Sequence, residues 1–368
     1  MKGFSIILIS LMMAGFILPD NSCGNSAPPS RNDGPYVIYK QGRIIVFNIE
    51  AKGENLKLKR DSYDSANRHK ILLKVPTGAG AEHFHFPLQK QLSEQPSVYA
   101  EPSRMLILSD IEANFTALRN LLLEGKVIDS SFNWTFGDGH LVLTGDFVDR
   151  GDQQTEVLWL IYSLEEKART AGGYVHYILG NHEIMNLSGD LRYLRPKYHE
   201  VEELMESSYT YLIGPQSEIG RWLRTKNVVE QIGNMLFTHG GISSSLNGLQ
   251  LPTDTINQLC RPYYGDSIYH YADPRQETLY GDQGPFWFRG YYQNTKGTEM
   301  ATIDSSLAFY KVSHIATGHT IIADTISVLY QQKIFNTDVH HAGGKSEALL
   351  KEGGHFYRLV KGEKKWLF

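Results

Sequence analysis

The sequence predicts a mixed α/β domain whose second half is rich in strands. From Met105 onward, short apolar runs typical of strands alternate with longer segments of helical spacing, a rhythm found in α/β proteins. After about residue 230, strand patterns dominate. The chain has 368 residues, of which 41% are hydrophobic. This is enough to bury a sizeable core, so a disordered chain is excluded.

The first residues predict an export signal. Lys2 is followed by an apolar run from Gly3 to Pro19, which has the length and position of a secretory h-region. A membrane-spanning helix needs about 20 apolar residues, and this run is slightly shorter. A signal peptide over residues 1–22 that is removed is therefore favoured over a retained anchor, and we expect an exported protein, periplasmic or on the outer surface.

Cys23 stands just past the apolar run, between a serine and a glycine. It resembles the modified cysteine of bacterial lipoproteins, although Asp20 and Asn21 depart from the small residues expected before such a cysteine. Lipid attachment through Cys23 and plain secretion therefore both stay open. Cys260 is the only other cysteine, which excludes a cysteine-based zinc cluster and favours a buried bystander.

The next segments predict a tether and a small extension. Residues 23–34 are rich in Ser, Pro, Asn and Gly, as in flexible linkers. Residues 36–50 hold two apolar-aromatic runs split by Gln41-Gly42, which predicts a β-hairpin, and residues 71–75 predict another strand. We therefore expect a β-rich N-terminal extension over residues 35–100 and the main domain over residues 101–368.

The main domain begins with three pairs of strand and helix. The predicted strands cover residues 105–108, 140–143 and 174–179, and the predicted helices cover residues 115–124, 155–170 and a segment after 179. Later strands are predicted at residues 234–237, 325–330, 333–336, 348–351 and 355–359. A further helix over residues 198–207 either caps a cleft or forms a solvated surface helix.

Residue types that bind metals follow these strands at the point where each ends. The first three strands precede Ser-Asp-Ile-Glu (109–112), Gly-Asp-Phe-Val-Asp-Arg-Gly (145–151) and Gly-Asn-His-Glu (180–183). Two later strands precede Thr-His-Gly-Gly (238–241) and Gly-His-Thr (318–320). One such residue alone would be explained as a helix cap or a core histidine. Since the ends of successive strands meet in one crevice, five such blocks predict a shared site.

Charge narrows the class of partner. The net charge of -4, from 36 basic and 40 acidic residues, provides no global attraction for nucleic acid or for an anionic membrane. We therefore expect no nucleic-acid partner. Any membrane attachment would come through a lipid on Cys23.

Taken together, the five blocks resemble the calcineurin-like metallophosphoesterase superfamily, whose motifs run D-x-H, G-D-x-x-D-R-G, G-N-H-E, H-G-G and G-H. The second and third motifs match in full, and the resemblance covers about residues 105–338. The blocks are similar to the phosphoprotein phosphatase branch, and Gly-Pro-Phe-Trp-Phe-Arg at 284–289 resembles a segment of its Shewanella-like members. The resemblance implies a four-layer α/β/β/α sandwich of two mixed sheets.

The resemblance also implies two divalent metal ions, from Mn, Fe, Zn and Mg, with Mn favoured. Asp146 would bridge the two ions. His182, paired with Asp149, would protonate the leaving oxygen, and Arg150 would bind phosphate oxygens through its planar fork. Arg289 is a second candidate for phosphate binding. The residues implied as metal ligands are Asp110, Glu112, Asp146, Asn181, His239 and His319.

Glu112 departs from the family pattern, which has histidine at this position. Because glutamate is itself an oxygen donor, Asp110, Glu112 and Asp146 could hold Mn or Mg, with weaker Lewis acidity. Alternatively, the position marks a degenerate site with one ion, or Glu112 turns away and leaves its place to water. The sequence leaves these three alternatives open.

The implied activity is hydrolysis of phosphomonoesters, including phosphoproteins, by attack of a metal-bound hydroxide with His182 as general acid. Two alternatives stay open: hydrolysis of dinucleoside polyphosphates or nucleotides, and a binding protein that kept the fold without activity. Glu183 is expected to be structural, bonding Arg150 or the backbone. Asp338 and His340, after a late strand, either sit near the site or are turn residues, and the turn is favoured.

Overall fold

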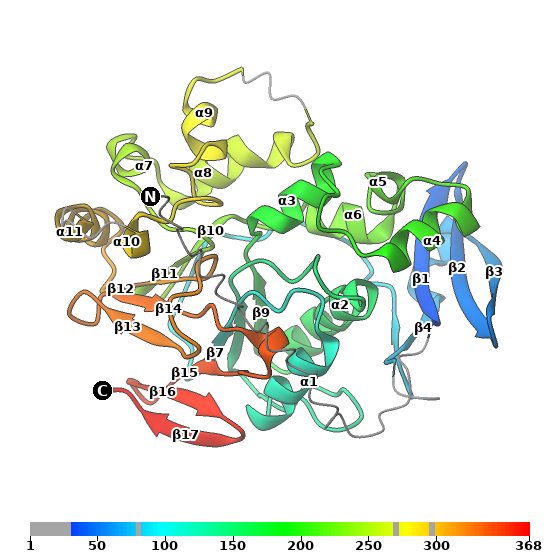
Figure 1. Ribbon diagram of the computed structural model, residues 1–368, viewed down its shortest axis with the longest axis horizontal. Coiled ribbons are helices and arrows are strands. Elements are labelled where there is room, and N and C mark those ends of the chain that lie inside the picture. The colour runs from blue at the N-terminus through cyan, green and yellow to red at the C-terminus, as the bar shows by residue number, and fades with distance from the viewer. Residues whose placement is uncertain (1–30, 79–81, 268–271, 294–298) are drawn as a thin grey trace, which may run out of the picture.

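The computed structural model describes residues 31–78, 82–267, 272–293 and 299–368. Two six-stranded sheets form its centre, with helices on both outer sides (Figure 1), as the predicted four-layer sandwich requires. The predicted signal peptide, Cys23 and most of the predicted tether lie outside the described residues. Within the described ranges, no helix combines the length and apolarity needed to cross a bilayer.

The first central sheet has the strand order β17-β16-β15-β7-β8-β9. β7, β8 and β9 run parallel, and β15 joins β7 antiparallel. Side chains alternate across β7: Met105 and Ile107 face the core between the two sheets, whereas Leu106 and Leu108 face the helices. The strand bounds are β7 Arg104–Leu108, β8 His140–Leu143, β9 Tyr174–Tyr177, β15 Ala348–Glu352, β16 His355–Val360 and β17 Glu363–Trp366.

The second central sheet has the order β13-β14-β12-β11-β10-β6. β11, β12 and β14 run parallel, so their carboxyl ends meet at one edge. Met235 and Phe237 of β11 join Phe335 of β14 in the core between the sheets. The strand bounds are β6 Val98–Tyr99, β10 Val229–Ile232, β11 Met235–Thr238, β12 His314–Thr317, β13 Ser327–Leu329 and β14 Ile334–Asn336.

Helices cover the outer faces of both sheets. α1 (Phe115–Glu124), α2 (Gln154–Thr170) and α3 (Asn181–Ser188) follow the first three parallel strands and match the predicted rhythm. The predicted strand-rich second half proves incomplete, because helices lie between β11 and β12. Their bounds are α7 Ser244–Gly248, α8 Thr253–Cys260, α9 Arg275–Tyr280, α10 Gly290–Gln293 and α11 Glu299–Tyr310.

α8 illustrates why helices were not predicted in this part of the chain. It buries Thr253, Ile256 and Cys260, a spacing of three and four residues that marks one helix face. The apolar residues are too few in this stretch to dominate the sequence signal. Cys260 is buried and unpaired, as expected of a bystander.

The N-terminal residues form β1 (Asp33–Lys40), β2 (Arg43–Lys52) and β3 (Asn55–Asp64), a three-stranded antiparallel sheet beside the main sandwich (Figure 1). The predicted hairpin is present, with its turn at residues 41–42. β4 (Leu72–Pro76) and β5 (His83–Pro87) form a second antiparallel pair.

Two predicted boundaries need correction. The predicted tether runs to residue 34, but Asp33 begins β1 and is buried. The predicted extension runs to residue 100, but β6 pairs with β10 and belongs to a central sheet. In both cases, pairing with a distant strand decides where ordered structure begins, and sequence composition does not report such pairing.

The predicted helix around residue 200 is present as α4 (Pro196–Met205), followed by α5 (Tyr209–Leu212) and α6 (Glu218–Leu223). Tyr198 and Val201 of α4 pack with Tyr36 and Ile38 of β1. Since its buried face lies on the N-terminal sheet, α4 is a surface helix and does not cap the cleft. The residues just before it, 190–193, reach the cavity instead.

Candidate active site

The strand-end blocks converge on one cavity of about 770 Å³. Asp149 and His239 lie behind its wall and contact wall residues: Asp149 pairs with His182, and His239 pairs with Asp146. Segments far apart in the sequence therefore deliver their polar side chains to one place, as predicted. The predicted site residues that line the cavity are Asp110, Glu112, Asp146, Arg150, Asn181, His182, Arg289 and His319.

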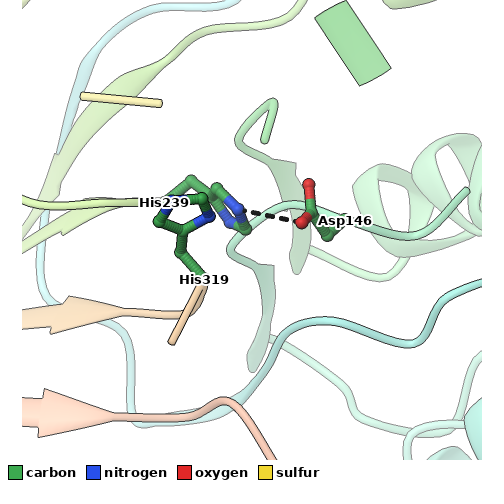
Figure 2. A group of neighbouring side chains, drawn as sticks. All are labelled: Asp146, His239 and His319. Carbon is green, nitrogen blue, oxygen red and sulfur yellow. Dashed lines mark ion pairs between the residues drawn. The ribbon is translucent and has the colours of Figure 1, made fainter. Parts of the chain in front are cut away.

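Asp146, His239 and His319 form the tightest group of possible metal ligands. One ligand atom from each lies within 4.8 Å of the others, and all three residues are buried. Figure 2 shows the Asp146 carboxylate reaching toward His239, with the His319 ring beside it. The His239 Nε2 atom lies 3.1 Å from Asp146 Oδ2 and 3.0 Å from Asn181 Oδ1.

The chemistry of this donor set fits a cation. His239 Nδ1 lies 2.7 Å from the Thr144 carbonyl oxygen, which can only accept, so Nδ1 carries the hydrogen. A neutral ring would point its Nε2 lone pair at two acceptor oxygens, so without a metal ion His239 must carry a second proton on Nε2. A bound cation satisfies all three atoms at once, and a backbone carbonyl behind the ring is the usual way to orient such a ligand.

Electrostatics point the same way. Burial lowers the pKa of His239, but the Asp146 carboxylate, helped by Asp110, outweighs burial and raises it to about 10. Burial raises the pKa of Asp110 to about 7. Burial, together with His239, lowers the pKa of His319 to about 2. The neutral His319 ring is a suitable metal ligand.

Several site residues have a left-handed backbone that side chains other than glycine rarely adopt. The φ angles are 50° at Asp110, 61° at Asp146, 67° at Asp149 and 71° at His319. Such conformations cost about 1–3 kcal/mol each and persist only where the surroundings enforce them. They turn the chain sharply after each strand, which aims the side chains into the cavity.

Glu183 holds the backbone in place at two of the strand ends. Its buried carboxylate accepts hydrogen bonds from the backbone N–H groups of Asp146 at 2.9 Å, Phe147 at 2.7 Å and Gly180 at 2.8 Å. The Tyr177 hydroxyl donates a fourth bond at 2.9 Å. Glu183 is thus structural, as expected, and bonds the backbone rather than Arg150.

His182 is positioned to donate a proton. Its Nδ1 atom lies 2.7 Å from Asp149 Oδ2, and its backbone N–H donates to Asp146 Oδ1 at 3.0 Å. Burial lowers the pKa of His182, but Asp146 and Asp149 outweigh it and hold the pKa above its usual value. The ring therefore holds a proton next to the cavity.

Two arginines line the same cavity. Arg150 makes an ion pair with Glu112, and its guanidinium lies over the Tyr193 ring, 5.3 Å from the centroid. Arg289 donates to the His319 carbonyl oxygen and to Thr320 Oγ1. Both can meet the oxygens of a bound phosphate. The structure thus places the Glu112 carboxylate against Arg150.

Asp338 is a site residue, the less favoured of the two interpretations that the sequence left for it. It lines the cavity and is 4% exposed, whereas a turn residue was favoured. Burial, and then the Asp110 carboxylate, raise its pKa to about 9. The signal was present, because Asp338 follows a predicted strand as the other site residues do, but a single Asp in that position is more often a turn residue.

Comparison with known proteins agrees with this geometry. Residues 103–323 match the family model described as calcineurin-like phosphoesterase. The chain is 29% identical to Shewanella-like protein phosphatase 1 of Plasmodium berghei over 227 residues, or 59% of this chain and 61% of that protein. It is 24% identical to Shewanella-like protein phosphatase 2 of Arabidopsis thaliana, covering 68% of this chain and 74% of that protein.

A solved structure is similar over nearly the whole described fold. The crystal structure of the cold-active protein-tyrosine phosphatase of a psychrophilic Shewanella species superimposes with a TM-score of 0.82 at 36% sequence identity. The match covers 92% of this chain and 99% of that one. It therefore includes most of the N-terminal β-rich region as well as the two central sheets.

Proposed function

Because the chain belongs to the calcineurin-like phosphoesterase family, we propose that it is a metal-dependent phosphatase that hydrolyses phosphomonoesters, including phosphoproteins. The observation that carries the proposal is a single cavity that joins a cluster of metal-ligand side chains, a histidine paired with a carboxylate, and two arginines. Phosphate-ester hydrolysis needs all three.

Two divalent ions bound at this site would supply a nucleophilic water and offset the charge that develops on the phosphate oxygens. We propose Asp110 and Asp146 as ligands of the first ion, and Asp146, Asn181, His239 and His319 as ligands of the second. Glu112 lies in the same cavity, where its carboxylate is paired with Arg150. The mixture of oxygen and nitrogen donors suits Mn, Fe, Zn or Mg, with Mn favoured.

The remaining roles belong to side chains of the cavity wall. Arg150 and Arg289 bind and orient the phosphate oxygens. His182 gives its proton to the leaving oxygen, and Asp149 keeps the ring charged and correctly turned. The Glu112 ion pair must open or shift when Arg150 meets a phosphate, because one guanidinium edge cannot serve both.

A phosphorylated protein side chain is the proposed substrate. The relatives from Plasmodium berghei and Arabidopsis thaliana are named as protein phosphatases, and the Shewanella structure is that of a protein-tyrosine phosphatase. The cavity is open and has aromatic and apolar residues beside its charged base, among them Tyr193, Tyr280, Trp287 and Ile321. This lining suits an aromatic phosphoester held on a peptide. We further propose that the protein is exported, as the apolar segment of residues 3–19 indicates.

The test compares three substrates with the purified protein in the presence of added Mn: p-nitrophenyl phosphate, a phosphotyrosine peptide and a dinucleoside polyphosphate. The proposal expects turnover of the first two. Preference for the dinucleoside polyphosphate would support a nucleotide hydrolase instead. No turnover with any substrate, metal or pH, together with no bound ion, would support a binding protein that kept the fold.

A further inference from the structure

The loop after β14 brings one more carboxylate to the site. Thr337 Oγ1 donates to Ser109 Oγ at 3.0 Å, and His341 Nε2 lies 3.2 Å from the Ser109 carbonyl oxygen. These two contacts fix the loop against the residue that precedes Asp110. Asp338 lies between the two anchors and lines the cavity with Asp110. A sixth chain segment therefore reaches the point where the other five converge.

Asp338 is a largely buried residue whose carboxylate faces the cavity without a hydrogen-bond partner among the described residues. The side chain belongs to a residue only 4% exposed, and within the described part of the chain no hydrogen bond reaches either carboxylate oxygen. Its backbone N–H donates to Asn336 Oδ1 at 2.9 Å, which orients the loop but leaves the side chain unpaired. A carboxylate taken out of water without a donor or a cation is costly, so such a group points to a ligand.

Three carboxylates line the cavity, those of Asp110, Asp146 and Asp338. Asp146 pairs with His239, and Asp110 accepts from the backbone N–H of His319. Within the described residues, the Asp338 carboxylate has neither a hydrogen bond nor an ion pair. Arg150 is paired with Glu112, and Arg289 attracts the three carboxylates without bonding any of them. A group of three carboxylates is an oxygen-rich site of the kind that binds Mn²⁺ or Mg²⁺.

From this geometry we infer that Asp338 is an oxygen ligand of the first metal ion, together with Asp110 and Asp146, while Glu112 mainly holds Arg150. The inference rests on the proposed function, because it requires ions at this site. It also explains how the site tolerates glutamate at position 112. The ligand that the family pattern supplies at position 112 is replaced by a carboxylate from a different segment of the chain.

The test counts metal ions in the wild type, Asp338→Asn and Glu112→Gln. Each full-length protein is stripped with a chelator, reloaded with Mn²⁺ and analysed for Mn per chain by plasma emission spectroscopy. Electron paramagnetic resonance then separates coupled Mn pairs from single ions. We expect about two ions per chain and a coupled signal for the wild type and Glu112→Gln. For Asp338→Asn we expect about one ion and the signal of an isolated Mn²⁺.

The two hypotheses fail in different ways. A wild type that binds no ion would sink the proposed function. A wild type and an Asp338→Asn variant that both bind two ions with equal affinity would overturn the inference alone, even if the variant is less active, because Asp338 would then act on the substrate.

Folding is checked by melting the chelated proteins. If Asp338 is a ligand, the chelated Asp338→Asn variant should melt at or above the temperature of the chelated wild type, because without ions this side chain has no partner to lose. A lower melting temperature would indicate that Asp338 serves the fold, and would contradict the inference.

Discussion

At the scale of single residues, His182 owes its proposed role to partners that come from two segments, the block after β8 and the residues before α4. The Nδ1 atom of His182 is hydrogen-bonded to Asp149, and the backbone N–H of His182 donates to Asp146. The Tyr193 ring lies beside the His182 ring, with the two centroids 5.0 Å apart. The backbone contact to Asp146 survives a side-chain substitution. Removing the ring should therefore affect proton donation without dismantling the metal site.

We predict that His182→Asn lowers kcat by about a hundred- to ten-thousand-fold with phenyl phosphate, which is the usual contribution of a general acid. The loss should be smaller with p-nitrophenyl phosphate, because its leaving group departs without a proton. The measurement is the ratio of the two kcat values, with bound metal counted as the control. Equal losses for both substrates would argue against proton donation by His182.

Glu183 gives a second prediction at this scale. Glu183→Gln replaces one acceptor oxygen by an NH₂ group that faces two backbone donors. Each buried donor left unpaired costs about 1–3 kcal/mol, so the free energy of unfolding should fall by about 2–6 kcal/mol. Urea unfolding measures this, and Glu203→Gln, on the exposed face of α4, is the matched control with little expected effect. A loss equal to that of the control would show that Glu183 does not hold the turn.

At the scale of elements, a buried ionic cluster joins β1, α2 and α4. Lys197 Nζ lies 3.4 Å from Asp33 Oδ1 and 3.7 Å from Glu156 Oε1. Burial raises the pKa of Glu156 to about 8, since the attraction of Lys197 is partly offset by Asp33. The N-terminal sheet is therefore attached to the main domain partly by a carboxyl group that is protonated near neutral pH.

This cluster predicts a pH-dependent stability. Because the folded pKa of Glu156 lies above its usual value of 4.5, its contribution is complete below pH 4.5 and is lost as pH rises to about 8. Glu156→Gln cannot ionise, so its unfolding free energy should fall less than that of the wild type between pH 5 and pH 8. Urea unfolding at several pH values measures both slopes, and parallel slopes would rule out Glu156 as the titrating group.

At the scale of the whole molecule, the fold lines one cavity with Asp110, Asp146 and Asp338 and places His239 just behind its wall, and bound cations would offset the charge of these carboxylates. An ion that binds only the folded state stabilises it by about 2.7 kcal/mol at a hundred times its Kd. We predict that added Mn²⁺ raises the melting temperature and that a chelator reverses the rise, as measured by differential scanning calorimetry. His239→Ala should abolish most of the shift, and an unchanged shift in that variant would place the ions elsewhere.

The sequence by itself determined the elements and the family. Strands at β7, β8, β11 and β14 and the helix α1 could be predicted because their apolar periodicity is local. The five polar blocks could be assigned because they are contiguous and follow strands, and the predicted family and four-layer fold are confirmed. The helices between β11 and β12 were missed, although α8 and α11 carry their buried residues at helical spacing.

Only the tertiary structure decided which carboxylates share the cavity. Glu112 is two residues from Asp110, yet its side chain meets Arg150; Asp338 is more than two hundred residues away, yet it lines the same wall as Asp110. The neighbours of a side chain depend on sheet order and loop anchoring, which are set by contacts between distant segments. A local sequence pattern predicts that a carboxylate follows a strand. The direction in which that side chain points is fixed by the packing of the folded chain.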